Sequence, residues 1–176
     1  MQAPGSLDWQ EDLSALIATP VARALAHWSR SDEVLGAPID PSLADTAAFC
    51  GRYAVEPADS ANCVVIAGRR GESVSHAACV VLATTRADVN GVVRRLLGAR
   101  KASFASVEDA VALTGMEFGG ITPIGLPAGW PILVDRAVAE SAVVVVGSGL
   151  RRSKLALPGD ALATLPDAQV VDGLAG

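Results

Sequence analysis

The stretch TGMEFGGITPIGLP, residues 114–127, constrains this chain more than any other segment and is called the Gly/Pro loop below. It holds four glycines and two prolines between flanks that have the patterns of regular structure. Glycine permits positive φ and a close approach of backbone to a ligand, whereas proline fixes its neighbours in an extended path. We therefore expect a rigid loop that presents backbone N–H and C=O groups rather than side chains.

The length and composition predict one globular domain over residues 1–176, with residues 1–18 as an N-terminal extension. Hydrophobic residues make up 51% of the chain and charged residues 19%. No apolar run approaches the ~20 residues of a membrane span, and the N-terminus has no signal-peptide pattern, so we expect a cytoplasmic protein. The net charge of −5 argues against binding to long duplex nucleic acid. It leaves room for a small basic rim that binds the end of an RNA.

Hydrophobic periodicity and capping signals predict alternating helices and strands. Helices are expected at 7–18, 19–28 (Thr19 as N-cap and Pro20 at the first helical position), 46–50 (capped by Asp45 or Thr46 and ending at Gly51), 89–98 (capped by Asp88), 108–115 (after the capping pattern that Ser106 opens) and 158–168. Strands are expected at 33–41, 62–68, 74–84, 130–135, 141–149, 153–157 and 169–174. Short links between them favour antiparallel pairing. The predicted fold is therefore α+β, a mixed, largely antiparallel sheet curled towards a barrel, with helices packed against it.

No side-chain catalytic machinery stands out in the sequence. Three cysteines are spaced too widely for metal or redox pairs and read as buried free thiols: Cys50, Cys63 and Cys79. His27 and His76 have the setting of surface or sheet residues rather than catalysts. No cluster has metal-ligand spacing. The run VVVVGSGLRRS lacks the third glycine and the following helix of a dinucleotide site, so we expect neither metal nor cofactor.

Charged residues near the predicted strand ends are candidates for contacts with a ligand. Arg151, Arg152 and Lys154 follow the turn 147–149, and we favour phosphate contact for this group. A second basic group surrounds a helix C-terminus, where the helix dipole favours cations: Arg94, Arg95, Arg100 and Lys101. Asp135 closes the apolar strand WPILVD and is either the N-cap of a helix over 136–141 or a carboxylate of the site.

Several segments of the chain, taken in their order along the sequence, resemble the YbaK/prolyl-tRNA editing family. The Gly/Pro loop is similar to the family's GGISPIG-type loop, and the other matching segments are NCVVIAG, VSHAACVVLAT, LLGARKASFAS, PILVD and VVVVGSGLRRSKL. The likeness covers roughly residues 20–172. It implies the family's fold and its activity, the hydrolysis of wrongly charged aminoacyl-tRNA. The implied partner is the acceptor end of a mischarged tRNA, tRNA(Pro) or a relative.

The resemblance also implies the residues of the site. The loop would hold the terminal adenosine and the ester carbonyl through its backbone, at Gly119, Gly120, Ile121, Thr122 and Pro123. Asp135 and the turn Gly147-Ser148-Gly149 would complete the pocket, and Arg151 and Arg152 would face the RNA. In the family, chemistry is largely assisted by the substrate itself, which would explain the missing nucleophile.

The chain departs from the family at Asn62. Editing members have a lysine at the start of this strand, whereas an asparagine can bind a carbonyl or a water but carries no charge. Three consequences stay open: altered substrate choice, a different catalytic arrangement, or binding without hydrolysis. The alternatives to a deacylase are thus a non-catalytic module that binds an aminoacyl-tRNA, a nucleotide or a protein, and a hydrolase of another small ester or amide.

Overall fold

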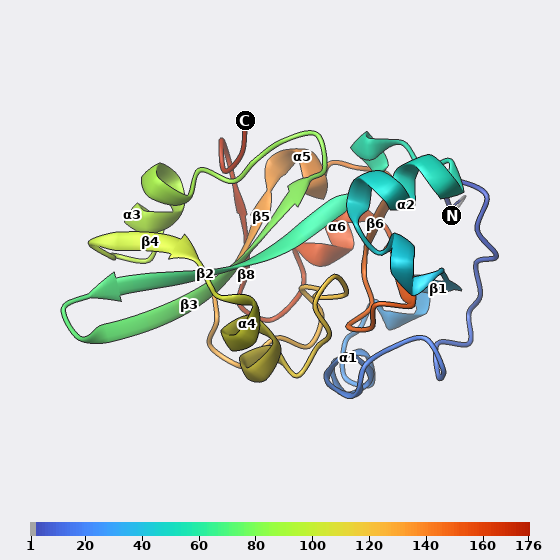
Figure 1. The fold of residues 1–176 in the computed structure, drawn as a ribbon, viewed down its shortest axis with the longest axis horizontal. Coiled ribbons are helices and arrows are strands. Elements are labelled where there is room, and N and C mark those ends of the chain that lie inside the picture. Colours follow the sequence, from blue (N-terminus) through green and yellow to red (C-terminus); the bar gives the residue numbers. More distant parts are fainter. Residues whose placement is uncertain (1–2) are drawn as a thin grey trace.

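The longest β structure is the hairpin formed by β2, Ala61–Arg70, and β3, Ser73–Leu82. In the computed structural model, which describes residues 3–176, this hairpin is the centre of a five-stranded sheet in the order β4-β2-β3-β5-β8 (Figure 1). The other strands are β4, Lys101–Phe104; β5, Ile132–Asp135; and β8, Ala168–Val171. β4, β2 and β3 pair antiparallel, whereas β3, β5 and β8 pair parallel.

A second sheet has three antiparallel strands in the order β1-β7-β6. Its strands are β1, Leu35–Pro38; β6, Val144–Gly147; and β7, Ser153–Leu157. A single parallel bridge between Ser60 and Val145 links it to the start of β2. The predicted α+β class with mixed, largely antiparallel pairing is confirmed, and the strands are divided between two sheets.

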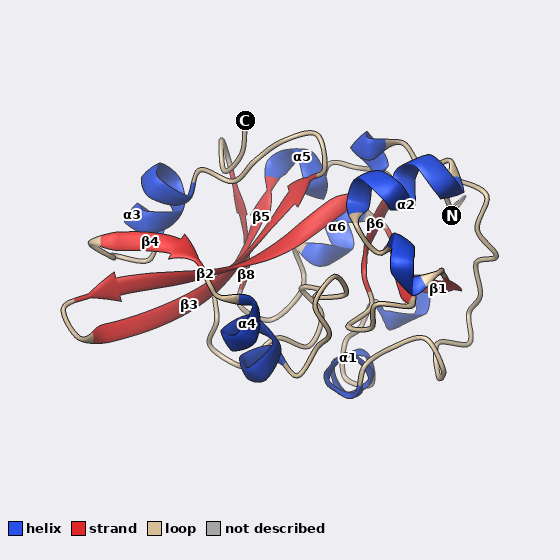
Figure 2. Cartoon of the chain, viewed as in Figure 1, coloured by secondary structure: helices blue, strands red, loops and turns tan. Residues whose placement is uncertain are grey.

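Short helices surround both sheets (Figure 2). They are α1, Thr19–Leu25; α2, Thr46–Tyr53; α3, Arg94–Leu96; α4, Val107–Thr114; α5, Arg136–Ala139; and α6, Gly159–Leu162. Single turns of 3-10 helix occupy Ser31–Glu33, Pro41–Leu43 and Pro57–Asp59, and a π-helical turn, Val89–Val93, leads into α3. Within residues 3–176, no helix has both the length and the apolar composition needed to cross a bilayer.

Side-chain caps begin several of these helices where the sequence predicts them. Asp45 accepts the amides of Ala47 and Ala48 at the start of α2, and Ser106 accepts the amide of Asp109 in α4. Asp88 likewise accepts two amides of the π-helical turn. Each cap satisfies amides that have no partner inside the helix, which fixes where the helix begins.

Other local predictions are wrong. Residues 7–18 form turns and a bridge between Gln10 and Gly36 rather than a helix, because their apolar side chains pack onto the core as a strap. The N-cap of α1 is Ala18 and not Thr19. Gly51 lies inside α2, which ends three residues later at Ala54 with positive φ. The short edge strand β4 has no clear period-2 pattern and is absent from the prediction.

Three groups of buried apolar residues hold the elements together. The largest joins α1, α5 and α6 to both sheets through residues such as Val21, Val134 and Leu155. A second lies between the five-stranded sheet and the turn that precedes α3. The third packs α2 against β6 and β7 and is centred on Phe49, which is fully buried. This third group places the N-terminal end of α2 beside the start of β2, where the candidate site lies.

Candidate functional site

Backbone hydrogen bonds fasten the Gly/Pro loop to the turn between β6 and β7. The amide of Glu117 donates to the carbonyl of Gly149 at 2.9 Å, and the amide of Gly149 donates to the carbonyl of Gly120 at 2.7 Å. The amide of Gly120 turns back to the carbonyl of Glu117 at 2.9 Å. The loop is therefore held on the end of the three-stranded sheet.

The Gly/Pro loop comes closest to the second sheet at Gly147, the last residue of β6. A Cβ at this position would lie 2.3 Å from the carbonyl oxygen of Gly120 and 2.5 Å from that of Ile121. Both distances are too short for a carbon atom, so only glycine allows the loop to lie here. Gly119 and Gly149 both have φ of +83°, a conformation that side chains with a Cβ seldom adopt.

A cavity of about 260 Å³ lies between this loop, the start of β2 and the N-terminal end of α2. It contains five of the residues predicted to form the site: Asn62, Gly119, Ile121, Gly147 and Arg151. The remaining lining comes from residues 44–46, Ala61, Cys63, Val64, Phe118 and Lys154. An open groove of about 780 Å³ adjoins the cavity and shares Asp45, Thr46 and Asn62 with it. We name the smaller space the loop cavity.

Asn62 is oriented by a neighbour from α2. The hydroxyl of Thr46 donates to Oδ1 of Asn62 at 2.7 Å. Because the carbonyl end of the side chain is occupied, the Nδ2 group is the end left to donate to a ligand. Within residues 3–176, the amides of Gly119 and Ile121 donate no backbone hydrogen bond either. The loop cavity thus has several neutral donors around it.

The two arginines after the turn have different positions. The guanidinium of Arg151 donates to the carbonyls of Pro41, at 2.9 Å, and Phe118, at 3.2 Å, and the side chain lines the loop cavity. Its backbone amide donates to the carboxylate of Glu117 at 2.6 Å. Arg152 is exposed, lies outside the lining and donates to the carbonyl of Ala15 at 3.2 Å. Arg151 braces the loop at the cavity, whereas Arg152 reaches the N-terminal segment.

Lys154 lines the floor of the loop cavity and is buried, with 8% of its surface exposed. It lies in the middle of the second sheet, between Ala37 of β1 and Gly147 of β6. Its Nζ lies 3.4 Å from the carbonyl oxygen of Ala44 and 5.2 Å from the centre of the Phe49 ring. Burial lowers the pKa of its amine below the usual value for lysine.

Other residues of the predicted site lie outside the lining of the loop cavity. Thr122 is fully buried, and its hydroxyl has no hydrogen-bond partner among residues 3–176. The hydroxyl of Ser148 is also buried and lies 2.8 Å from that of Ser153, which holds the turn together. Gly120 and Gly149 form the bonds between loop and turn described above. Pro123 borders a different cavity.

Asp135 has the capping role that the sequence left as one of two readings. Its Oδ1 accepts a hydrogen bond of 3.0 Å from the amide of Ala137 and so caps the N-terminal end of α5. Its Oδ2 accepts the amide of Ala175 at 3.1 Å. The side chain is 7% exposed and does not line the loop cavity. Both carboxylate oxygens are thus used to join α5 and the segment at Ala175.

The lining of the loop cavity includes a thiol, that of Cys63, a side-chain type that serves as a nucleophile in other enzymes. Burial raises the pKa of this thiol far above its usual value, so it stays protonated at neutral pH. The lining includes no histidine to take its proton. Across residues 3–176, no three His, Cys, Asp or Glu side chains are grouped to hold a metal ion. The polar groups of this lining are amides, the hydroxyl of Thr46, the carboxylate of Asp45 and two cations, Arg151 and Lys154.

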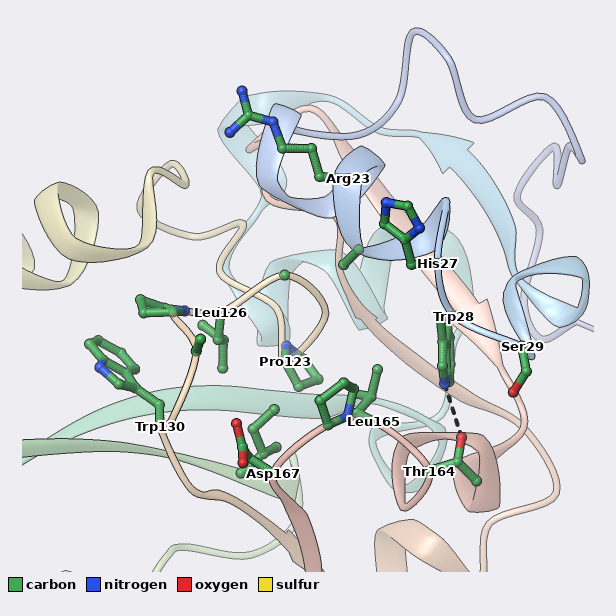
Figure 3. Close-up of a pocket in the computed structure, with 16 residues that line it drawn as sticks. Arg23, His27, Trp28, Ser29, Pro123, Leu126, Trp130, Thr164, Leu165 and Asp167 are labelled. Atoms are coloured by element: carbon green, nitrogen blue, oxygen red, sulfur yellow. Dashed lines mark hydrogen bonds between the residues drawn. The ribbon is translucent and has the colours of Figure 1, made fainter.

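A second cavity, of about 470 Å³, lies at the C-terminal half of the Gly/Pro loop. Figure 3 shows Trp28 and Trp130 on opposite sides of it, with Leu126, Pro123 and Leu165 between them. The indole of Trp28 donates to the hydroxyl of Thr164 at 3.0 Å. Most of this lining is apolar, and Asn62, Gly147 and Lys154 are absent from it. We therefore place the candidate site in the loop cavity, where the polar groups converge.

Sequence reasoning missed Thr46 and assigned Lys154 only to a basic group that follows a turn. Thr46 had a signal, because a capped helix start places a hydroxyl next to free amides. Lys154 also had one, because it alternates in β7 with Leu155 on the opposite face. The turn between β6 and β7 indicates that these two strands pair, and they do. What the sequence lacks is the pairing of β7 with β1, which makes β7 the central strand and buries this lysine.

Comparisons with known proteins show a family and related folds. Residues 40–165 match the family described as the aminoacyl-tRNA editing domain. The fold is similar to the crystal structure of a candidate trans-editing enzyme for prolyl-tRNA synthetase, with a TM-score of 0.71 and 22% identity over 88% of this chain and 97% of that chain. It is also similar to a structure from work on grafting epitopes onto scaffold proteins, with a TM-score of 0.72 and 23% identity over the same shares of the two chains.

Proposed function

Because the chain belongs to the aminoacyl-tRNA editing domain family, we propose that it is a deacylase that hydrolyses the ester bond of a mischarged tRNA in trans. The observation that carries this proposal is the loop cavity. It is bounded by the Gly/Pro loop, the start of β2 and the end of β6, the segments that the resemblance assigns to substrate. The similar trans-editing candidate for prolyl-tRNA synthetase supports tRNA(Pro) or a relative as the tRNA.

In this proposal the donors around the loop cavity hold the acylated end of the tRNA. The Nδ2 group of Asn62 and the amides of Gly119 and Ile121 bind the ester carbonyl and the terminal adenosine. Backbone and amide donors that stabilise a developing oxyanion contribute about 3–4 kcal/mol each in measured hydrolases. Small residues line the cavity, among them Ala44 and Ala61, which suits a small amino acid such as alanine.

Water is the nucleophile in this proposal, because the Cys63 thiol stays protonated. The water oxygen bonds to the carbonyl carbon, and the carbonyl electron pair moves onto the oxygen. Collapse of this intermediate breaks the bond to the ribose oxygen, which takes up a proton as it leaves. The products are a free amino acid and an uncharged tRNA. A ribose hydroxyl of the substrate is the group placed to assist the water, as the family resemblance implies.

The test is the deacylation of a panel of mischarged tRNAs, with alanyl-, cysteinyl- and seryl-tRNA(Pro) as its core. We expect turnover of at least one member and little turnover of free aminoacyl esters. Correctly charged prolyl-tRNA(Pro) is the control. If no member is hydrolysed at high enzyme concentration, the deacylase proposal fails.

A non-catalytic aminoacyl-tRNA binding module is the second candidate, and the uncharged Asn62 is the observation that favours it. The variant Asn62→Lys separates the two functions. A gain of deacylation in this variant would indicate a scaffold specialised for binding. A loss of existing deacylation would indicate a site that works through the asparagine.

A further inference from the structure

Lys154 is one of only two lysines in this chain, which has twelve arginines. The other, Lys101, is exposed on the edge strand β4, whereas Lys154 is buried at the floor of the loop cavity. Lys154 lies on the same face of β7 as Ala156, towards the fully buried Phe49 of α2. The amine of Lys154 thus belongs to the central strand of the three-stranded sheet.

The protein does not neutralise this charge with an ion pair. Within residues 3–176, the ion pairs are formed by Arg30 and Arg136, and none by Lys154. In the described part of the chain, the only hydrogen bond of its Nζ is the long one of 3.4 Å to the carbonyl of Ala44. An ammonium group has three donors, so most of its bonding capacity is unused. Burying a charge without a partner is costly, and this cost calls for a ligand that satisfies it.

The position of the amine decides which part of a ligand it meets. The exposed Arg152 and the half-buried Arg151 lie nearer the outside, where the phosphates of an RNA are accessible. Lys154 pairs across the strands with Gly147, the residue against which the Gly/Pro loop packs. A small oxygen atom at the end of an acyl group can reach this floor more easily than a phosphate group can.

We propose that Nζ of Lys154 binds the carbonyl oxygen of the aminoacyl ester and stabilises the oxyanion formed in hydrolysis. The inference rests on the proposed function and names a further catalytic residue for it. When water bonds to the carbonyl carbon, the electron pair of the C=O bond moves to the oxygen beside the ammonium. The charge of Lys154 is then paired for the first time, so the interaction is stronger in the transition state than in the free enzyme. When the intermediate collapses, the pair returns and the ribose oxygen leaves with a proton.

The test compares the variants Lys154→Met and Lys101→Met. Methionine keeps the length and apolar stem of lysine without the charge. We expect K154M to lower kcat for deacylation by about 100-fold or more, as the removal of an oxyanion donor does, while K101M has wild-type kcat. Because a buried unpaired charge is removed, the Tm of K154M should equal or exceed that of the wild type. Lys154→Gln is the second variant if K154M does not fold.

A binding experiment separates this inference from the proposed function. The probes are adenosine and 3′-alanylamino-3′-deoxyadenosine, a non-hydrolysable analogue that has the acyl carbonyl but no phosphate. We expect K154M to bind the analogue about tenfold more weakly than the wild type does, and to bind adenosine equally well. If the wild type binds the analogue through Lys154 but hydrolyses no tRNA, the deacylase proposal and the oxyanion role of Lys154 fail, whereas its binding of the acyl carbonyl oxygen holds.

Three results would overturn the inference. One is deacylation by K154M at the wild-type rate, and another is unchanged binding of the analogue by K154M. The third is an equal loss of adenosine and analogue binding, or a loss of inorganic phosphate binding, which would assign the amine to another part of the nucleotide. A wild type that neither hydrolyses nor binds the acylated probe would remove both proposals.

Discussion

The hydroxyl of Thr46 fixes which end of the Asn62 side chain faces the loop cavity. Without this donor, Oδ1 of Asn62 loses its partner at 2.7 Å and the amide can turn over. We expect Thr46→Val, which keeps the shape of the side chain, to lower kcat by about fivefold, the equivalent of one neutral hydrogen bond of ~1 kcal/mol. Thr46→Ser, which retains the hydroxyl, should restore kcat. Steady-state deacylation kinetics measure both, and a change confined to KM would contradict a role in orienting Asn62.

The buried amine of Lys154 also makes stability depend on pH. Its pKa in the folded protein lies below the usual 10.5 because burial disfavours the charged form. Below the folded-state pKa both states carry the charge, so the whole penalty of burying it applies. Between that pKa and 10.5 the unfolded chain binds more protons, so wild-type stability rises with pH. Lys154→Met has no amine to titrate, so its stability should not show this rise with pH.

The stability advantage of K154M over the wild type should therefore be largest at neutral pH and shrink as the pH approaches 10. Urea unfolding at a series of pH values measures it. Two charged groups also act on the pKa of Lys154: the carboxylate of Asp45 raises it, and the guanidinium of Arg151 lowers it. Burial raises the pKa of the nearby Cys50 thiol above its usual value. An advantage that grows with pH would mean that the folded protein favours the charged amine.

At the scale of elements, the sequence predicted what is decided locally. The caps at Asp45, Asp88 and Ser106 and the hairpin between β2 and β3 depend on neighbouring residues, and all are present. One partner of β7, the neighbouring strand β6, is local, whereas the other is distant in sequence, since Lys154 pairs with Ala37 of β1. No local pattern contains that pairing. For this reason the sequence identified the Gly/Pro loop and the basic turn but could not show which of their residues line one cavity.

The contact between the Gly/Pro loop and the end of β6 depends on a missing Cβ. We expect Gly147→Ala to displace the loop, to destabilise the protein by about 1–3 kcal/mol as overpacking does, and to reduce deacylation strongly. Gly51→Ala is the matched control for stability, because a Cβ there meets nothing within 4 Å inside helix α2. It should stabilise the protein by about 0.5–1 kcal/mol. Equal effects of the two substitutions on urea unfolding would contradict the close approach at Gly147.

At the scale of the whole molecule, the loop cavity lies where the two sheets meet. β2 contributes Asn62 from the five-stranded sheet, and β6 and β7 contribute Gly147 and Lys154 from the three-stranded one. The bridge between Ser60 and Val145 joins these sheets beside the cavity. Their relative position therefore sets the distance between the donors on the two sides. Substitutions that loosen the packing between the sheets should affect kcat more than those that loosen the far end of the β2–β3 hairpin.

Asp135 lies in the same five-stranded sheet as Asn62 but ties different parts of the molecule together. Its carboxylate joins α5 to the segment that contains Ala175, and this segment also pairs with the region of Arg86 and Asp88. Asp135→Ala removes an N-cap and also takes away the partner of the partly buried amide of Ala175. We expect it to lower the free energy of unfolding by about 2–4 kcal/mol. Because the side chain lies outside the loop cavity, kcat per folded molecule should stay at the wild-type value.

Asp172→Ala is the control for this prediction, because Asp172 is an exposed carboxylate of the same region that pairs with Arg136. An exposed ion pair of this kind contributes little to stability, so D172A should unfold at nearly the same urea concentration as the wild type. Deacylation is measured well below the unfolding midpoint of each variant. If D135A is fully folded under those conditions and still loses deacylation, its carboxylate takes part in the reaction. The assignment of Asp135 to a purely structural role outside the loop cavity is then wrong.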